Sequence, residues 1–210
     1  MKFESIGMLL NRTLIDFKNS HIEIVEFNDE EVYSKCEFMI KVGYQPFDQE
    51  AFMLLAKFLI ARDKRKIKKG LCLFGNTGVG KTLWMKKFAC CKVVSVYNLV
   101  NIFVEHGIKT ALNIVNPPYW LDVIPPNYFD ICIDDFGAEE SQNHYGTKKD
   151  VLTEIIDERY RAKFKGGKTY ITTNLTPGKI RARYGDRILS RISELCTVIE
   201  IHGEDLRINM

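Results

Sequence analysis

Residues 71–82 have the sequence Leu71-Cys72-Leu73-Phe74-Gly75-Asn76-Thr77-Gly78-Val79-Gly80-Lys81-Thr82, a short apolar strand followed by a glycine-rich loop. Glycines allow positive φ and close approach of the backbone, so the N–H groups of residues 75–80 can surround phosphate oxygens. A helix is expected next, and its N-terminus also favours negative charge. Lys81 can then reach the β- and γ-phosphates, while the Thr82 hydroxyl binds Mg²⁺. The stretch therefore predicts a site for ATP and Mg²⁺ in residues 75–82.

Two carboxylates end a second diagnostic stretch, Ile131-Cys132-Ile133-Asp134-Asp135-Phe136. The apolar run over residues 129–133 is typical of a buried parallel strand. Charges at the end of such a strand are costly unless they meet a cation, and Mg²⁺ at the loop supplies one. Asp134 is the expected metal ligand. Asp135 is placed to orient or polarise a water, which favours hydrolysis over phosphoryl transfer to an organic acceptor. The alternative is that these residues only form a turn at the strand end.

Polar residues that follow the next strand form a third group of candidates. Asn174 ends the run Thr172-Thr173-Asn174 and can sense the γ-phosphate or hold the attacking water, although asparagine there is more often a turn residue. Arg187 and Arg191 are four residues apart on an expected helix and share one face. They are either solvated charges, or one of them is an arginine finger for a neighbouring subunit.

The rest of the chain alternates between strand and helix patterns, which predicts an α/β fold with a parallel sheet and helices on both faces. Strands are expected at residues 71–74, 93–96, 129–133, 169–173 and 198–201. Helices are expected from the caps Asp48 and Thr176, around residues 81–88, 99–104 and 151–160, and after Asp186.

Residues 1–44 are expected to be an N-terminal extension, and residues 45–210 the main domain. Apolar residues at helical spacing over 6–17, a short strand pattern over 22–27 and a helix start at Asn28 mark the extension. An extension this short cannot build its own core. We therefore expect it to pack on the main domain or to bind a partner.

The composition is that of a soluble globular protein, with 46% hydrophobic residues, 27% charged residues and a net charge of +3. No apolar run is long enough to cross a bilayer, and no signal-peptide pattern begins the chain. The six cysteines show no metal-binding spacing, so we expect reduced thiols and a cytoplasmic protein. The basic run Lys64–Lys69 is a candidate contact for nucleic acid, against the simpler interpretation of a solvated face.

These motifs, in this order, resemble those of the AAA+ ATPases, and more closely those of the DnaC-type replicative helicase loaders and the IstB-like transposition helpers. The resemblance covers about residues 45–210. Tyr184–Ile192 is similar to the family's box VII, and the segment Gly203-Glu204-Asp205-Leu206-Arg207 is similar to its terminal segment.

The resemblance implies roles for individual residues. Lys81 and Thr82 match Walker A, Asp134 and Asp135 match Walker B, and Asn174 matches sensor 1. Arg191 becomes the arginine-finger candidate, and Arg207 a candidate for the sensor 2 role. The fold implied is a three-layer P-loop NTPase with sheet order 5-1-4-3-2 and no C-terminal helical lid. The extension is shorter than expected for a complete helicase-binding module, and residues 105–128 contain few basic residues.

The leading functional hypothesis is an ATP-hydrolysing helicase loader that acts on single-stranded DNA and a replicative helicase, and that self-associates through the arginine-finger face. The second is an ATPase that remodels DNA for a transposase. The third is a nucleotide-dependent binding switch with negligible turnover. A small-molecule kinase is disfavoured by the paired aspartates and the late arginines. No hypothesis involves a membrane.

Overall fold

The computed structural model describes residues 27–44, 48–116, 130–139, 151–162, 167–205 and 207. Its centre is a five-stranded sheet in which every pairing is parallel. The strands are β1 (Gly70–Gly75), β2 (Lys92–Ser95), β3 (Ile131–Phe136), β4 (Thr169–Thr173) and β5 (Cys196–Ile201). They lie in the order β2-β3-β4-β1-β5, which is the expected 5-1-4-3-2 order counted from the opposite edge. The predicted fold class is confirmed.

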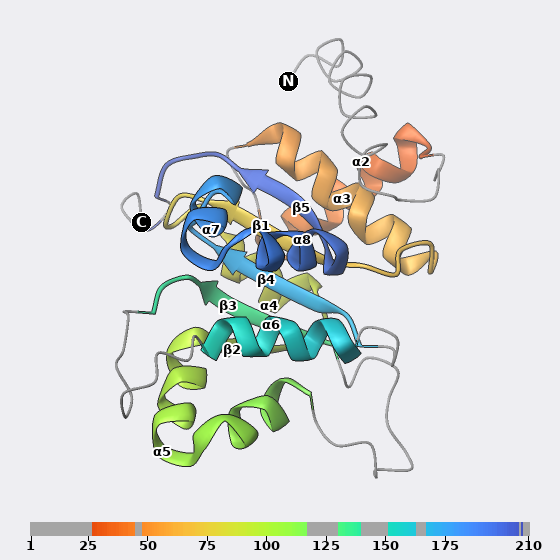
Figure 1. Cartoon of the computed structure of the whole chain (residues 1–210). Coiled ribbons are helices and arrows are strands. Elements are labelled where there is room, and N and C mark those ends of the chain that lie inside the picture. Colours follow the sequence, from red (N-terminus) through yellow and green to blue (C-terminus); the bar gives the residue numbers. More distant parts are fainter. Residues whose placement is uncertain are drawn as a thin grey trace.

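Seven helices of the described residues surround the sheet: α2 (Asp29–Lys41), α3 (Gln49–Asp63), α4 (Lys81–Phe88), α5 (Val96–Val115), α6 (Val151–Ala162), α7 (Pro177–Tyr184) and α8 (Asp186–Leu195). Side chains of β1 alternate between two cores because successive residues of a strand point to opposite faces. Leu71 and Leu73 pack with α2, α3 and α4 in one core, while Cys72 packs with α5, α6 and α8 in the other. Figure 1 shows the resulting three layers, with α6 and α8 on the near side of the sheet and α4 behind it.

Several helix ends follow the local signals in the sequence. The carboxylate of Asp48 accepts a hydrogen bond of 3.0 Å from Ala51 N, and Thr176 caps α7 with Pro177 in the first turn, as predicted. Helix α5 is longer than the expected 99–104, because Ser95 caps it and it continues past a kink at Gly107. Gly107 has φ +78°, outside the helical region, so α5 is two helical segments in series.

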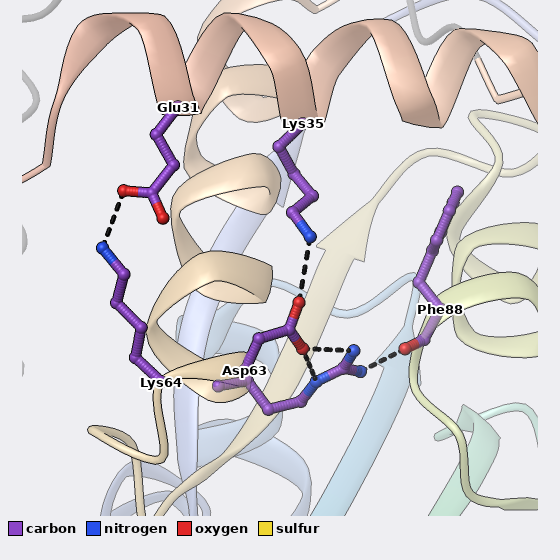
Figure 2. Close-up of polar contacts among 6 residues, drawn as sticks. Glu31, Lys35, Asp63, Lys64 and Phe88 are labelled. Atoms are coloured by element: carbon purple, nitrogen blue, oxygen red, sulfur yellow. Dashed lines mark hydrogen bonds and ion pairs between the residues drawn. The ribbon is translucent and has the colours of Figure 1, made fainter.

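The described part of the N-terminal extension packs on the main domain. Val32, Met39 and Tyr44 are buried in the same core as α3 and α4. Figure 2 shows polar links between α2 and the end of α3: Lys35 Nζ lies 2.9 Å from Asp63, and Lys64 Nζ lies 2.7 Å from Glu31. These contacts agree with the expectation that the extension packs on the main domain, while the domain boundary itself stays a prediction.

The polar network of Figure 2 continues to α4. Arg62 bonds the carboxylate of Asp63 at 3.0 Å and also donates to the backbone carbonyl of Phe88, the last residue of α4. The ring of Phe38 on α2 packs edge-on against Phe88, with 6.3 Å between ring centroids. Helix α2 therefore rests against the carboxyl end of the helix that begins with Lys81.

Three sequence predictions concern residues outside the described ones: the helix and strand patterns over residues 6–26, the proline-rich region 117–126 and the first part of the strand at 129–133. After β5, residues 202–205 and 207 form no helix. No helix within the described ranges has both the length and the apolar character required to cross a bilayer.

Candidate nucleotide-binding site

The glycine-rich loop leaves β1 at Gly75 and enters α4 at Lys81. Gly78 has φ +80°, and a Cβ atom at this position would lie 1.8 Å from a carboxylate oxygen of Asp205. Gly80, with φ +94°, precedes the first residue of α4. The positive φ at Gly78 favours glycine, so the loop keeps the close backbone approach that phosphate binding needs.

A pocket of about 370 Å³ lies over this loop at the carboxyl ends of the strands. Open parallel sheets bind ligands at this edge. The pocket is lined by Thr77, Gly78, Gly80, Lys81, Thr82, Leu83, Asp135, Ala138, Asn174 and Arg207. Its volume is in the range of small-molecule and cofactor sites. The tertiary structure thus brings most of the predicted site residues to one cavity.

Lys81 is buried at the base of the pocket and is held by three oxygen atoms. Its Nζ lies 2.9 Å from Gly75 O, 2.6 Å from Asn76 O and 2.8 Å from Asn174 Oδ1. Burial lowers the pKa of the ammonium group, while the nearby charge of Asp135 acts to raise it. The ammonium is therefore desolvated and oriented, which strengthens its interaction with an anion that enters the pocket.

The residues expected to bind Mg²⁺ are in direct contact. Thr82 Oγ1 donates a hydrogen bond of 2.8 Å to Asp134 Oδ1. Asp134 is buried at the end of β3, beside the start of α4. Magnesium prefers oxygen ligands and is commonly held by one or two protein side chains together with substrate phosphates and waters. A hydroxyl and a carboxylate that meet beside the phosphate-binding loop fit this ion.

Asp135 follows in β3, where the pairing with β4 is irregular between Ile133 and Phe136, with its side chain at the pocket and φ at +61°. Burial and the neighbouring charge of Asp134 raise the pKa of the Asp135 carboxyl, while Lys81 and Arg207 act against this rise. The two adjacent aspartates therefore have different surroundings: Asp134 contacts Thr82, and Asp135 faces the open pocket. The metal role of Asp134 and the water-orienting role of Asp135 stay predictions.

Thr172 is a residue to which the sequence analysis assigned no role. Its hydroxyl donates to Asp134 Oδ1 at 2.6 Å and accepts a hydrogen bond of 2.9 Å from Asp135 N. One hydroxyl on β4 thus holds both aspartates of β3. The only signal in the sequence is that Thr172 precedes Asn174 at the end of a strand, and this signal does not name its partners.

The predicted site residues at the end of the chain are split between two places. Arg207 lines the pocket, and its backbone N–H donates to Asp205 Oδ1 at 2.9 Å. Arg191 is not among the described residues that line the pocket. It forms an ion pair with Asp157 on α6, and its guanidinium lies 5.0 Å from the centre of the Tyr160 ring. Arg187 also pairs with Asp157.

The two arginines of α8 differ in accessibility. The side chain of Arg187 is 65% exposed, that of Arg191 is 19% exposed, and that of Asp157 is 8% exposed. The position of Arg191 away from its own pocket is compatible with an action on a neighbouring subunit, and equally with a structural ion pair. Between the two, Arg187 is the cation that faces solvent.

No protein-family model and no curated protein matches this chain. Solved structures similar to it include the crystal structure of DnaI, at 21% identity over 89% of this chain and 88% of that one, with a TM-score of 0.47. The DnaC helicase loader is 21% identical over 75% of this chain and 93% of that one, with a TM-score of 0.49. AMPPCP-bound DnaA from Aquifex aeolicus is 19% identical over 74% of this chain and 48% of that one, with a TM-score of 0.46.

The second of these structures is that of a helicase loader, the class of protein that the motifs resemble. Because the identities and TM-scores are low, the fold assignment depends on the chain's own features. These are the parallel strand order, the glycine-rich loop between β1 and α4, and the aspartates at the end of β3. By these features, the chain has the P-loop NTPase fold with the 5-1-4-3-2 strand order expected of an AAA+ ATPase.

Proposed function

We propose that this chain is an ATP-binding and ATP-hydrolysing DNA replication factor, similar to a helicase loader, which acts on single-stranded DNA and a replicative helicase. The observation that carries the ATPase part is the convergence of Lys81, Thr82 and Asp134 below a pocket that Asp135 and Asn174 also line. Each of these residues has the chemistry required for its part of phosphate, metal or water binding.

In this proposal, the chain's own groups bind and orient the nucleotide. Backbone N–H groups of residues 75–80 and the ammonium of Lys81 hold the phosphates, and Thr82 with Asp134 holds Mg²⁺. Magnesium supplies positive charge next to the β- and γ-phosphate oxygens. Asp135 orients the attacking water by accepting its hydrogen bond, and Asn174 holds either this water or the γ-phosphate. Arg207 lies at the pocket rim, where a cation can contact the bound phosphates.

In this proposal, an arginine of α8 acts on the nucleotide that a neighbouring subunit binds. An arginine finger stabilises the charge that develops on the γ-phosphate, and it does so from outside the subunit that binds the nucleotide. Neither Arg187 nor Arg191 is among the described residues that line their own pocket. Arg191 is the candidate from the motif resemblance, so a self-associated form with the arginine face of one copy against the pocket of the next is part of the proposal.

The DNA and helicase parts of the proposal depend on the resemblance of residues 184–192 and 203–207 to helicase loaders. A cytoplasmic location follows from the same proposal. Single-turnover ATP hydrolysis, measured with and without single-stranded DNA and with Lys81→Ala as the inactive control, tests the enzymatic part. Turnover that depends on Lys81 and Mg²⁺ supports an ATPase. Tight ATP binding without hydrolysis under every condition would instead indicate the binding switch.

Co-purification separates the two remaining candidates. The full chain is mixed with a replicative helicase or with a transposase, each in the presence of ATP and Mg²⁺. Retention of the helicase alone supports the loader. Retention of the transposase, together with binding to duplex DNA, would replace the loader with the transposition helper.

A further inference from the structure

Residues 135–139, which we call the turn, comprise the last two residues of β3 and the three residues after it, and their backbone conformation needs support from outside. Asp135 has φ +61° and Gly137 has φ +90°, so two residues of the segment 135–139 are left-handed. Non-glycine residues rarely adopt this conformation, and they keep it only when their surroundings enforce it. A Cβ atom at Gly137 would lie 2.3 Å from the side chain of Leu175, so the turn is also tightly packed.

Strand β4 holds the first half of this turn. Asp135 N donates to the hydroxyl of Thr172 at 2.9 Å, and the hydroxyl of Thr173 donates to the backbone carbonyl of Phe136. Both contacts come from residues of a strand that is paired directly with β3. The position of Asp135 relative to Asp134 is therefore set within the sheet.

Helix α7 holds the second half through Arg183 and Tyr184. Arg183 Nη1 donates to Gly137 O at 2.6 Å, and Arg183 Nη2 donates to Glu139 O. The guanidinium also bonds the carboxylate of Glu139, with 2.8 Å between Nη2 and Oε1. Tyr184 donates its hydroxyl to the same Glu139 oxygen. Its ring packs against Phe136 of the turn, with 4.9 Å between ring centroids.

The contacts that Arg183 and Tyr184 make with the turn lie close enough to the pocket to affect its lining. Asp135 and Ala138, two residues of the turn, line the pocket, whereas no described residue of α7 is among its lining residues, so α7 can affect the pocket through the turn that it contacts. The side chain of Glu139 is 12% exposed and that of Arg183 is 34% exposed, so the ion pair is shielded more than a surface pair. A planar guanidinium that bonds two carbonyls and a carboxylate at once also fixes their relative orientation.

We propose that Arg183 is a positioning residue: with Glu139 and Tyr184, it holds the turn of residues 135–139 so that Asp135 is directed at the nucleotide pocket. This role deepens the proposed ATPase function and depends on it for its kinetic consequence, while the hold on the turn itself does not depend on ATP. Arg183 touches neither nucleotide nor water in this role, and it acts through the backbone of the turn.

The first test is hydrogen exchange on the full chain without nucleotide. The Ala138 amide donates to Asp135 O at 2.9 Å and reports on the turn. In Arg183→Ala we expect it to exchange about tenfold faster or more, because the local opening of the turn becomes easier. Amides of β1 serve as the internal reference and should be unchanged. Arg181→Ala is the matched control, since Arg181 lies on the same helix and pairs only with the exposed Asp186 among the described residues. An Ala138 amide that exchanges as in the wild type would overturn the proposal.

The second test separates positioning from binding. In Arg183→Ala we expect kcat for ATP to fall by about 10- to 100-fold with KM changed by less than about twofold, because a misplaced catalytic group costs rate and not substrate affinity. Glu139→Gln keeps the acceptor oxygen and should retain most activity, while in the double variant Arg183→Ala/Glu139→Ala the two losses of kcat should combine to less than the product of the single losses, because both changes break the same ion pair. If the wild type hydrolyses ATP and Arg183→Ala has the same kcat, the positioning role of Arg183 is contradicted. Absence of hydrolysis in the wild type would contradict the ATPase function. The hydrogen-exchange test would still decide whether Arg183 holds the turn.

Discussion

Lys81 Nζ donates a hydrogen bond of 2.8 Å to Asn174 Oδ1, which joins the first residue of α4 to the residue that follows β4. The contact exists because β4 lies next to β1 in the sheet, with Thr173 paired to Phe74. The lysine of the loop and the polar residue at the strand end are 93 positions apart in the chain. Both reach the same pocket, and the consequences of this arrangement can be tested residue by residue.

Removal of the Lys81 ammonium should abolish tight ATP binding. We expect Lys81→Ala to weaken ATP affinity by about 10- to 100-fold or more, the range for loss of a charged hydrogen-bond donor. Isothermal titration with ATP and Mg²⁺ measures the effect. Lys86→Ala is the matched control, because Lys86 is an exposed lysine of the same helix. Near wild-type affinity in Lys81→Ala would contradict the phosphate-binding role of the loop.

Substitutions of the two aspartates should affect ATP binding and ATP hydrolysis differently. Asp135→Asn removes the charge that polarises water but leaves Asp134 for Mg²⁺, so ATP should still bind while turnover falls by about 10²-fold or more. Asp134→Asn should instead raise the Mg²⁺ concentration needed for activity, measured by titration of Mg²⁺ at saturating ATP. Equal loss of ATP binding in both variants would show that the two roles are assigned wrongly.

Removal of the Thr172 hydroxyl should lower the free energy of unfolding and raise the Mg²⁺ concentration needed for activity. Thr172→Val leaves Asp135 N without its acceptor and removes one donor to Asp134, which should cost about 1–3 kcal/mol of the free energy of unfolding. It should also raise the Mg²⁺ requirement, because Asp134 loses part of its orientation. Thr197→Val is the control: its hydroxyl is buried on β5 without a hydrogen-bond partner among the described residues, so this change should be close to neutral. Equal effects of the two variants in a denaturant titration would contradict a specific role for Thr172.

Substitution of Arg191 should destabilise the protein more than substitution of Arg187. Arg191→Ala removes a mostly buried partner of Asp157 and should cost at least about 1 kcal/mol of the free energy of unfolding. Arg187 is largely exposed, so Arg187→Ala should cost less than about 1 kcal/mol. Thermal unfolding of both variants checks this order.

The arginine-finger role of Arg191 predicts more than a stability loss. Arg191→Ala should bind ATP normally and fail to hydrolyse it, and mixing it with Lys81→Ala chains should restore part of the activity. Such a mixture contains interfaces that pair an intact loop with an intact arginine. DNA and the helicase are added so that the chains can assemble. Near-normal hydrolysis by Arg191→Ala alone would show that the ion pair with Asp157 is its whole role. Inactivity that mixing does not restore would indicate an action within one subunit.

The basic run Lys64–Lys69 gives a prediction about DNA that the structure sharpens. Lys64 pairs with Glu31, and Lys69 donates to Ser193 O at 2.9 Å, whereas Lys66 and Lys68 are exposed. If the run contacts single-stranded DNA, Lys66→Gln/Lys68→Gln should reduce the slope of log affinity against log salt by about 1.4, at about 0.7 per phosphate contact. Lys64→Gln is the matched comparison and should change the slope less. An unchanged slope in the double variant would exclude these lysines from the DNA contact.

Local chemistry made much of the fold and site predictable from the chain itself. The caps at Asp48 and Thr176, the strand before Gly75 and the glycine loop all depend on residues within a few positions of one another, so short-range patterns were sufficient. The same holds for the aspartates at the end of β3, whose cost of burial implies a cation. The sheet order came from the resemblance of the motifs to a known family, because periodicity alone does not say which strands become neighbours.

Contacts between distant elements were decided only by the tertiary structure. No local pattern shows that Thr172 holds Asp134 and Asp135, that Asp157 pairs with Arg191, or that Arg183 holds the turn at Glu139. Each of these contacts joins elements that come together only once β3, β4 and the helices after them have packed. Side chains that are ordinary polar residues in the sequence become specific when packing removes water and leaves one partner within reach. The sequence alone thus determined the loop, the aspartates and the elements that carry them, whereas the packing of β3, β4, α6, α7 and α8 decided which side chains hold them in place.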